Sequence, residues 1–356
     1  MAGHTFYMER CLALAERGAG LVAPNPMVGC VIVHRGKIIG EGFHHEFGGP
    51  HAEVNAVRSV RDPRLLREST LYVSLEPCAH MGKTPPCSEL IIRERIPRVV
   101  IGMRDPFTEV AGKGEQQLKK AGIETITGIM EKECRELNRR FLTFQEKKRP
   151  YVILKWAQTS DGFIDSRSGG EDSGKPVWIS SPLARRLVHR CRSLEGAILV
   201  GTATAMMDNP SLTVRDWSGE NPLRLVIDRK ARLPRSLHLF DNQAETVIFT
   251  EQATASEGKC RFEPMDFATG LPSRILGYLY SRHIQSLMVE GGAATLAGFL
   301  ESNLWDEAHI YTAPLFFGKG VKAPVARGRL VAEEDLDGTH LAVLLNETAL
   351  SQHEMG

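Results

Sequence analysis

The stretch that decides the fold consists of residues 51–53, His-Ala-Glu, followed by residues 76–78, Glu-Pro-Cys, and residues 85–87, Pro-Pro-Cys. One imidazole and two thiols can supply three ligands to a zinc ion and leave the fourth tetrahedral position to water. An open position is typical of a catalytic metal, because the pKa of the bound water falls to ~7. We therefore expect a zinc site whose ligands are His51, Cys78 and Cys87.

The second residue after the first ligand is a carboxylate, Glu53. At this spacing it can face the metal-bound water without binding the metal, and a carboxylate can carry that water's proton to a leaving amine. Zinc nucleobase deaminases divide the work in the same way, with an H-x-E element followed by P-C-x-x-C. We expect Glu53 to be the catalytic proton carrier.

The spacing of the two cysteines departs from that pattern. Eight residues separate Cys78 from Cys87, whereas one turn presents both thiols when they are about two to four residues apart. The wide gap therefore means either an inserted loop or a failure of the zinc interpretation. His80, inside the gap, is a competing ligand, and a chance combination of three unrelated residues is the remaining alternative.

Length and composition favour a two-domain enzyme. A chain of 356 residues suits two domains of ~150 to 200 residues, and its 42% hydrophobic and 24% charged content is typical of soluble globular proteins. A net charge of +1 supplies no strong electrostatic footprint for polymeric nucleic acid. The seven irregularly spaced cysteines and the absence of a signal-like or membrane-spanning run predict a cytoplasmic protein with reduced thiols and no membrane partner.

In the first half, strands are expected at residues 30–33, 38–40, 71–75 and 99–102. Helices are expected at residues 5–18, from 51 and at 88–95, so the order α-β-β-α-β-α-β predicts an α/β sandwich around one sheet. A closing helix over 131–144 and a charged linker at 145–150 follow. We therefore expect two domains, residues 1–146 and 147–356.

The second half alternates strands and helices, which predicts a mainly parallel sheet that binds ligands at the carboxyl ends of its strands. Gly291 and Gly292 lie at one such end and precede a helix, where backbone N–H groups can bind phosphate. The pattern is not G-x-G-x-x-G, so it does not predict a Rossmann fold. A tight strand-to-helix turn is the simpler alternative. The strands are expected at residues 150–157, 197–201, 223–228, 246–250 and 286–290.

Several motifs of the first half closely resemble the deaminase half of the bifunctional riboflavin-biosynthesis deaminase/reductase family. That family carries the wide cysteine gap, which removes the objection raised above. The motifs are PNPMVG at 24–29, HAEV at 51–54, EPC at 76–78, GKTPPC at 82–87, DP at 105–106 and AGKG at 111–114.

This resemblance implies a cytidine-deaminase-like α/β/α sandwich with zinc ligands His51, Cys78 and Cys87 and with Glu53 as the proton carrier. It also implies three substrate-binding residues, Asn25, His44 and Lys83, of which Lys83 suits a ribose phosphate. Asn25 between two prolines is otherwise simple turn chemistry, and Lys83 is otherwise an exposed loop lysine. Phe107 stands where the family often has asparagine.

Motifs of the second half resemble the reductase half of the same family, which implies a dihydrofolate-reductase-like α/β domain that uses NADPH. These motifs are Lys155 and residues 160–162, 201–204, 208–210, 212–215 and 290–292. The implied cofactor-binding residues are Trp178, Thr204, Asp208, Gly291 and Gly292. The implied substrate-binding residues are Arg192, Leu212, Arg215 and Glu290.

The two arginines of this site could clamp a phosphate. Pro176 and Arg229 stand where relatives often have hydroxyl residues, and no general acid is evident in this half. The resemblance runs from about residue 5 to residue 325, and the tail after Arg327 matches nothing in it.

Together these features predict a bifunctional enzyme that deaminates diaminohydroxyphosphoribosylaminopyrimidine and then reduces the ribosyl group of the product with NADPH. We expect a small pyrimidine nucleotide as substrate, a homo-oligomer, and no nucleic acid partner. One alternative is a polynucleotide-editing deaminase whose second half binds RNA. Others are a zinc-stabilised binding protein with a closed metal site and a chain in which only one half is active.

Overall fold

The computed structural model describes residues 2–79, 85–106, 112–166 and 178–347. The chain forms two compact units, Met1–Lys148 and Arg149–Gly356, and this division lies two residues after the boundary expected from the linker. Each unit has its own sheet and its own core.

The first unit is built on a five-stranded sheet in the order β2-β1-β3-β4-β5. Strand β1 runs antiparallel to β2 and β3, whereas β3, β4 and β5 are parallel. The strands are β1 (Gly29–His34), β2 (Lys37–Phe43), β3 (Ser69–Leu75), β4 (Arg98–Met103) and β5 (Glu124–Thr127). The helices are α1 (Ala2–Ala15), η1 (Glu16–Gly18), α2 (Ala52–Ser59), η2 (Pro63–Glu68), α3 (Cys87–Arg93), α4 (Lys113–Lys120), α5 (Glu131–Leu137) and α6 (Arg139–Lys147).

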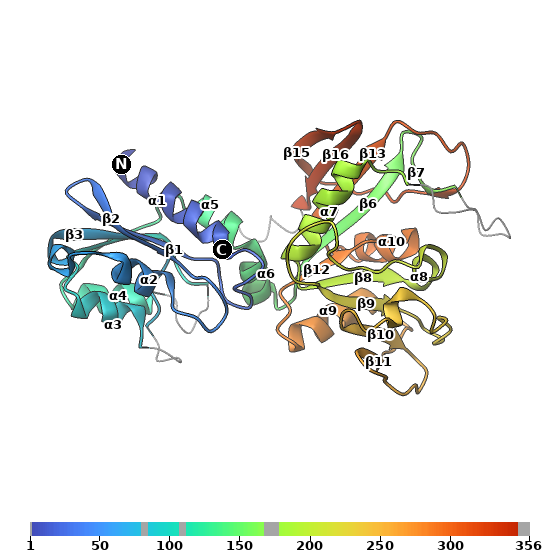
Figure 1. The fold of residues 1–356 in the computed structure, drawn as a ribbon, viewed down its shortest axis with the longest axis horizontal. Coiled ribbons are helices and arrows are strands. Elements are labelled where there is room, and N and C mark those ends of the chain that lie inside the picture. The colour runs from blue at the N-terminus through green and yellow to red at the C-terminus, as the bar shows by residue number, and fades with distance from the viewer. Residues whose placement is uncertain (1, 80–84, 107–111, 167–177, 348–356) are drawn as a thin grey trace. The chain divides into compact units, whose positions relative to one another are not determined.

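Both faces of this sheet are buried, because successive side chains of a strand point to opposite faces. On β1, Ile32 packs with α2, α3 and α4, whereas Val31 packs with α1, α5 and α6. Two helical layers therefore enclose one sheet (Figure 1), which confirms the predicted α/β/α sandwich.

The expected closing helix is divided into α5 and α6 at Asn138, whose side chain is buried. Its amide oxygen accepts a hydrogen bond from Met27 N at 2.8 Å, and its amide nitrogen donates to Met27 O at 3.0 Å. These two hydrogen bonds hold the segment around Asn25 against the junction between α5 and α6.

The second unit contains a nine-stranded sheet in the order β11-β10-β9-β8-β12-β6-β13-β16-β15. From β11 to β13 all neighbours are parallel, as predicted, and β16 and β15 are added antiparallel. Its strands are β6 (Tyr151–Thr159), β8 (Ala197–Gly201), β9 (Leu223–Ile227), β10 (Thr246–Thr250), β11 (Cys260–Pro264), β12 (Ser286–Val289), β13 (Glu307–Ala313), β15 (Arg329–Leu336) and β16 (Thr339–Leu345). The remaining elements are β7 (Phe163–Asp165), β14 (Val321–Lys322), α7 (Pro182–Leu194), α8 (Thr202–Asp208), η3 (His238–Phe240), α9 (Leu271–Ser281) and α10 (Ala293–Glu301).

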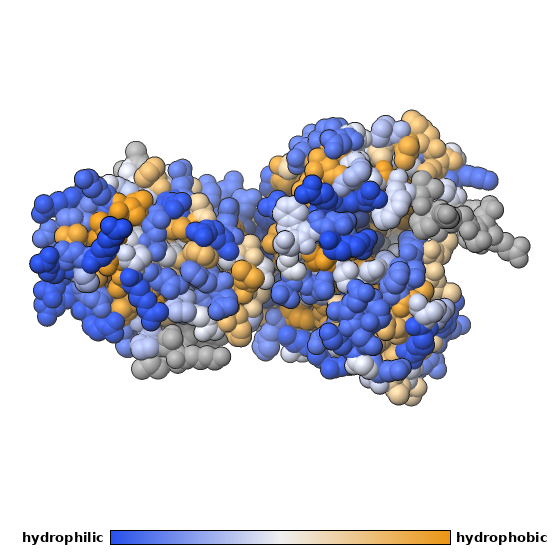
Figure 2. All heavy atoms as spheres, viewed as in Figure 1, coloured by the Kyte–Doolittle hydropathy of each residue, from blue (hydrophilic) through white to orange (hydrophobic). Residues whose placement is uncertain are grey.

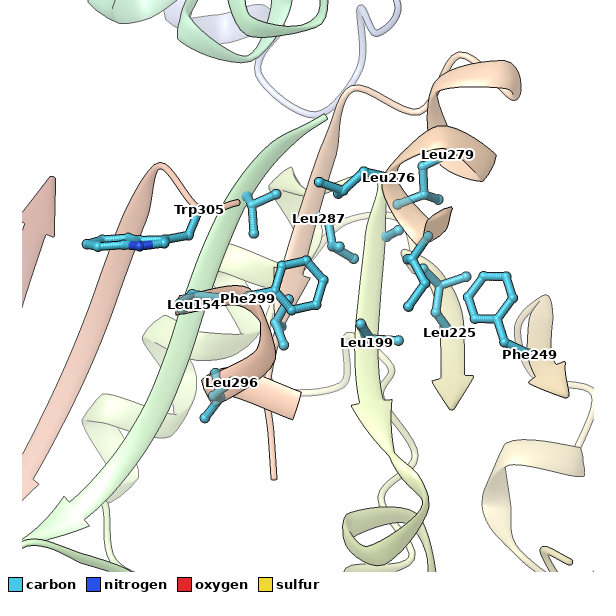
Figure 3. Close-up of a cluster of buried hydrophobic side chains, with 14 of the residues drawn as sticks. Leu154, Leu199, Leu225, Phe249, Leu276, Leu279, Leu287, Leu296, Phe299 and Trp305 are labelled. Atoms are coloured by element: carbon cyan, nitrogen blue, oxygen red, sulfur yellow. The ribbon is translucent and has the colours of Figure 1, made fainter. Parts of the chain in front are cut away.

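The main core of this unit lies between the parallel strands and helices α9 and α10. Figure 3 shows leucines of neighbouring strands, such as Leu199 and Leu287, gathered around Phe299 of α10. Helix α7 covers part of the opposite face through Val188, which packs with Tyr311 of β13. The tail that matched no motif forms β15 and β16 and so completes the sheet.

The helices of the described residues include none that is both long and apolar enough to cross a membrane. On the face shown in Figure 2, hydrophilic side chains cover most of each unit, and hydrophobic ones are spread among them in small groups.

Candidate active sites

Three segments bring the predicted metal ligands together. His51 follows Pro50 and caps α2 in an extended conformation, Cys78 lies three residues after β3, and Cys87 is the first residue of α3. His51 Nδ1 lies 3.6 Å from Cys78 Sγ and 3.4 Å from Cys87 Sγ. Ligand atoms of a tetrahedral zinc site with bonds of 2.0 to 2.3 Å are ~3.5 Å apart, so the three side chains fit a zinc ion.

Only one of the two cysteines, Cys78, already favours thiolate, which is the form that binds metal. A hydrogen bond with Cys87 is the main cause that lowers the pKa of Cys78, to about 4, and the same bond raises the pKa of Cys87. The backbone N–H of Cys87 donates to Cys78 Sγ at 3.3 Å. One thiolate is therefore already stabilised in the protein itself.

Glu53 is the second residue of α2 and is only 3% exposed. Burial is the main cause that raises its pKa to about 7, with a further contribution from Cys78. A carboxyl group with a pKa near neutrality can both take up and release a proton. The structure thus places the predicted proton carrier beside the predicted ligands.

The cluster opens into a cavity of ≈ 710 Å³ within the first unit, a size typical of small-molecule sites. His44 Nδ1 lies 3.0 Å from Pro50 O, and because a carbonyl only accepts, this nitrogen carries the proton. His44 Nε2 then accepts from Asn25 Nδ2 at 3.0 Å. Burial lowers the pKa of His44, so the ring stays neutral. Asn25 and His44 line the cavity together, and no described residue forms a hydrogen bond with the Asn25 side-chain oxygen.

Several cavity residues were not predicted. Glu76 belongs to the E-P-C motif, and its carboxylate accepts backbone N–H groups of Asp105, Gly112 and Glu115 at 3.0 to 3.2 Å. It therefore holds α4 against the end of β3. Lys113 contributes an ammonium group to the cavity wall, and Phe141 and Gln145 of α6 also line it, with no local sequence signal. Lys83, Phe107, Pro176 and the competing ligand His80 lie outside the described residues.

In the second unit, Arg192 of α7 pairs with Glu290 at the end of β12. The two Arg192–Glu290 bonds measure 2.7 and 2.8 Å, and the third guanidinium nitrogen donates to Thr213 O at 3.2 Å. Each guanidinium nitrogen of Arg192 thus donates one hydrogen bond within the protein, and the expectation that Arg192 helps to clamp a phosphate stays a prediction. Burial would raise the pKa of Glu290, but Arg192 and Lys155 lower it to about 2.

The segment from Leu212 to Arg215 contacts α7 through Arg192 and His189. Leu212 is buried and precedes Thr213, and Arg215 N donates to His189 Nδ1 at 3.2 Å. Burial, followed by the charge of Arg192, lowers the pKa of His189 to about 4. His189 was not predicted, although it lies three residues before Arg192 on the same helix.

The turn formed by Gly291 and Gly292 packs closely against α8, as expected of a turn that binds a nucleotide phosphate. Gly291 has φ +122°, and a Cβ atom on Gly292 would lie 3.0 Å from Thr204 Oγ1 of α8. The turn and Thr204 therefore lie together, and Asp208 ends the same helix. These residues fit a dinucleotide, because free backbone N–H groups at a helix N-terminus can donate hydrogen bonds to a phosphate.

Two further residues named from the resemblance, Trp178 and Arg229, lie at the surface. Trp178 is 64% exposed, and its ring contacts the guanidinium of Arg185 on α7 at 4.5 Å. Arg229, where relatives often have a hydroxyl, pairs with Glu251 at 2.8 Å.

Both units match known protein families. The model of the cytidine and deoxycytidylate deaminase zinc-binding region matches residues 1–103, and that of the RibD C-terminal domain matches residues 150–348. The riboflavin biosynthesis protein RibD of Aquifex aeolicus is 39% identical over 320 residues, which cover 88% of each chain. That of Escherichia coli is 36% identical over 340 residues and 89% of each chain.

Solved structures agree over nearly the full length. The crystal structure of a diaminohydroxyphosphoribosylaminopyrimidine deaminase/5-amino-6-(5-phosphoribosylamino)uracil reductase from Thermotoga maritima has a TM-score of 0.88 and 39% identity, covering 97% of this chain and 99% of that one. Acinetobacter baumannii RibD has a TM-score of 0.86, 33% identity and the same coverage. The chain therefore belongs to the RibD family of bifunctional deaminase/reductases of riboflavin biosynthesis.

Proposed function

We propose that this chain performs two successive reactions on one pyrimidine nucleotide. The first unit deaminates diaminohydroxyphosphoribosylaminopyrimidine by hydrolysis, and the second reduces the ribosyl group of 5-amino-6-(5-phosphoribosylamino)uracil to ribityl. The observation that carries the proposal is the cluster of His51, Cys78 and Cys87 beside Glu53 at the wall of the cavity.

In the first unit, His51, Cys78 and Cys87 would hold a zinc ion, which would supply the Lewis acid that makes water nucleophilic at neutral pH. Glu53 takes the proton from the attacking water and delivers it to the departing amine nitrogen. The Asn25 side-chain oxygen, left over from its bond to His44, accepts a hydrogen bond from the pyrimidine. Two ammonium groups suit the ribose phosphate, Lys83 by its motif and Lys113 by its place in the cavity wall.

In the second unit, NADPH supplies the hydride. We assign its phosphates to the Gly291–Gly292 turn, with Thr204 and Asp208 alongside and Trp178 as a stacking surface. Glu290 is held ionised by Arg192 and can accept hydrogen bonds from ribose hydroxyls. The substrate lies between Glu290 and the stretch from Leu212 to Arg215.

Lys155 fills the role of the proton donor that sequence left unassigned. It belongs to β6, and burial lowers the pKa of its ammonium group while Glu290 raises it. An ammonium group in this position can give a proton to the ring oxygen as the sugar opens.

The test follows ammonia release and nicotinamide absorbance together in one cuvette with zinc-loaded protein, the diaminopyrimidine nucleotide and NADPH. We expect both signals, with NADPH oxidation delayed until ammonia appears. Ammonia release without NADPH oxidation would refute the reductase assignment. Silence in both channels combined with salt-dependent RNA binding would favour a polynucleotide deaminase.

We further propose a cytoplasmic homo-oligomer without a nucleic acid partner. All seven cysteines are unpaired, as expected in a reducing compartment. Within the described residues, β15 pairs only with β16, and Leu330 and Val331 on it are 47% and 42% exposed. An exposed edge strand is a pairing surface, and a second copy is the occupant we assign to it. Light scattering should give at least twice the chain mass, and a monomer would refute this assignment.

A further inference from the structure

The segment from Leu212 to Asp216 is held by side chains rather than by secondary structure. None of the described helices and strands includes it, and Val214 N donates instead to Asn221 Oδ1 at 2.7 Å. Leu212, which is buried, has a φ of +53°. A leucine in the left-handed region is strained, and such strain persists only where the surrounding structure imposes it. The contacts that impose this backbone therefore indicate what the segment is positioned for.

Helix α7 holds the segment with two side chains one turn apart. Arg192 donates a hydrogen bond to Thr213 O at 3.2 Å. Three residues earlier on the helix, His189 Nδ1 accepts a hydrogen bond from Arg215 N at 3.2 Å. The backbone on both sides of residue 214 is thus fixed to the same helix.

The bond from Arg215 N requires a neutral imidazole with its proton on the far nitrogen. A backbone N–H only donates, so Nδ1 must accept and Nε2 must carry the hydrogen. His189 Nε2 lies 3.4 Å from Asp216 Oδ2, so a carboxylate of the same segment faces this N–H and orients the ring. His189 is 3% exposed, and burial followed by the charge of Arg192 lowers its pKa to about 4. The acceptor is therefore present at neutral pH.

The guanidinium of Arg215 is left for a ligand. The residue is exposed, and within the part of the chain that the structure describes its guanidinium forms no ion pair and no hydrogen bond. A guanidinium suits a phosphate, because its planar donors match the phosphate oxygens. Its direction depends on the backbone from which it extends, and the bond to His189 fixes that backbone.

We propose that His189 is a positioning residue of the reductase, which fixes the backbone of Arg215 so that its guanidinium meets the phosphate of the nucleotide. This inference rests on the proposed function, in which the segment from Leu212 to Arg215 contacts the substrate. The phosphate is remote from the ribose carbon that receives the hydride. A contact with it is equally strong before and during the reaction, so its loss should raise the KM for the nucleotide and leave kcat unchanged.

The experiment measures reduction of the deaminated nucleotide by zinc-loaded full-length variants. His189→Asn keeps the acceptor, because its side-chain oxygen occupies the place of Nδ1, whereas His189→Gln carries its oxygen out to the place of Nε2. We expect His189→Gln to raise the KM for the nucleotide about tenfold, with kcat and the KM for NADPH unchanged. His189→Asn should stay within about twofold of the wild type. The matched control Val188→Ala removes packing between α7 and Tyr311 and should leave this KM unchanged.

A double-mutant cycle tests whether His189 acts through Arg215. Arg215→Gln should itself raise the KM for the nucleotide, and His189→Gln added to it should raise that KM by less than about twofold more. Effects that multiply, an equal rise in Val188→Ala, or a His189→Asn variant as impaired as His189→Gln would overturn the proposal. If His189→Gln does not fold, His189→Leu takes its place, since leucine fills the buried position without an acceptor.

Binding of ribose 5-phosphate, measured by isothermal titration calorimetry, gives a readout that needs no reduction. We expect the same cycle in its Kd. A wild type that binds ribose 5-phosphate in dependence on His189 but does not oxidise NADPH would refute the proposed reductase and leave the role of His189 standing. An active reductase whose KM ignores His189→Gln would refute the role of His189 alone. A wild type that neither binds ribose 5-phosphate nor reduces the nucleotide would overturn both.

Discussion

Replacing Glu290 with glutamine tests the pair that anchors the reductase site. Both side chains of the pair are nearly buried, 10% exposed for Arg192 and 9% for Glu290. The pKa of Glu290 falls from 4.5 to about 2 on folding, and 1.36 kcal/mol per pKa unit gives about 3 kcal/mol of stability. A lowered carboxyl pKa stabilises the fold above pH ~4.5, and this contribution is lost as the pH falls towards 2. Glu290→Gln should therefore lower the free energy of unfolding by about 3 kcal/mol at pH 7, and by about half as much near pH 3.

The assay is urea unfolding followed by tryptophan fluorescence. All four tryptophans, at positions 156, 178, 217 and 305, belong to the second unit, so the signal reports this unit alone. The matched control is Glu251→Gln, which breaks the exposed pair with Arg229, whose side chains are 58% and 33% exposed. An exposed pair should contribute less than about 1 kcal/mol. Equal losses in the two variants, or a loss in Glu290→Gln that grows on acidification, would refute the reasoning.

Three further predictions concern activity. Glu53→Gln should slow ammonia release by about 10²- to 10⁴-fold while zinc content and reductase activity on the deaminated nucleotide persist; loss of zinc would instead make Glu53 a ligand. Removing zinc with a chelator should abolish ammonia release and spare that reductase activity, and an equal loss of both would contradict separate sites. Gly292→Ala places a Cβ 3.0 Å from Thr204 Oγ1 and should raise the KM for NADPH, whereas in Gly298→Ala the nearest atom is 3.8 Å away and KM should not change; equal effects would remove the turn from the cofactor site.

Sequence alone predicts those residues of the deaminase site that lie in short motifs. His51 and Glu53 are two residues apart on one helix end, and Cys78 and Cys87 each follow a proline, so residue type and spacing already indicate metal chemistry. Phe141 and Gln145 could not be found in this way. They come from α6, more than fifty residues after the last ligand, and only the packing of that helix brings them to the cavity.

In the reductase site, too, sequence does not show which distant residues contact each other. Resemblance to a family indicates Arg192 and Glu290, which are 98 positions apart, but only the structure shows that they bind each other. Sequence does not reveal which charges are already paired, so the prediction that Arg192 clamps a phosphate took no account of its ion pair with Glu290 and stays a prediction. The hairpin of β15 and β16 was likewise missed, since an antiparallel addition to a parallel sheet has no motif of its own.

The geometry of the metal cluster depends on contacts that lie outside its own motifs. Cys78 is held in a short loop after β3, and the residue two positions before it, Glu76, accepts three backbone N–H groups from the segment that begins α4. Ser88 Oγ, next to Cys87, lies 3.0 Å from Cys78 O and 2.6 Å from Gln117 Oε1 of α4, and its single hydrogen is shared between these two acceptors. Both cysteines are therefore fixed against α4, and this explains how two thiols eight residues apart can keep the spacing of a tetrahedral site.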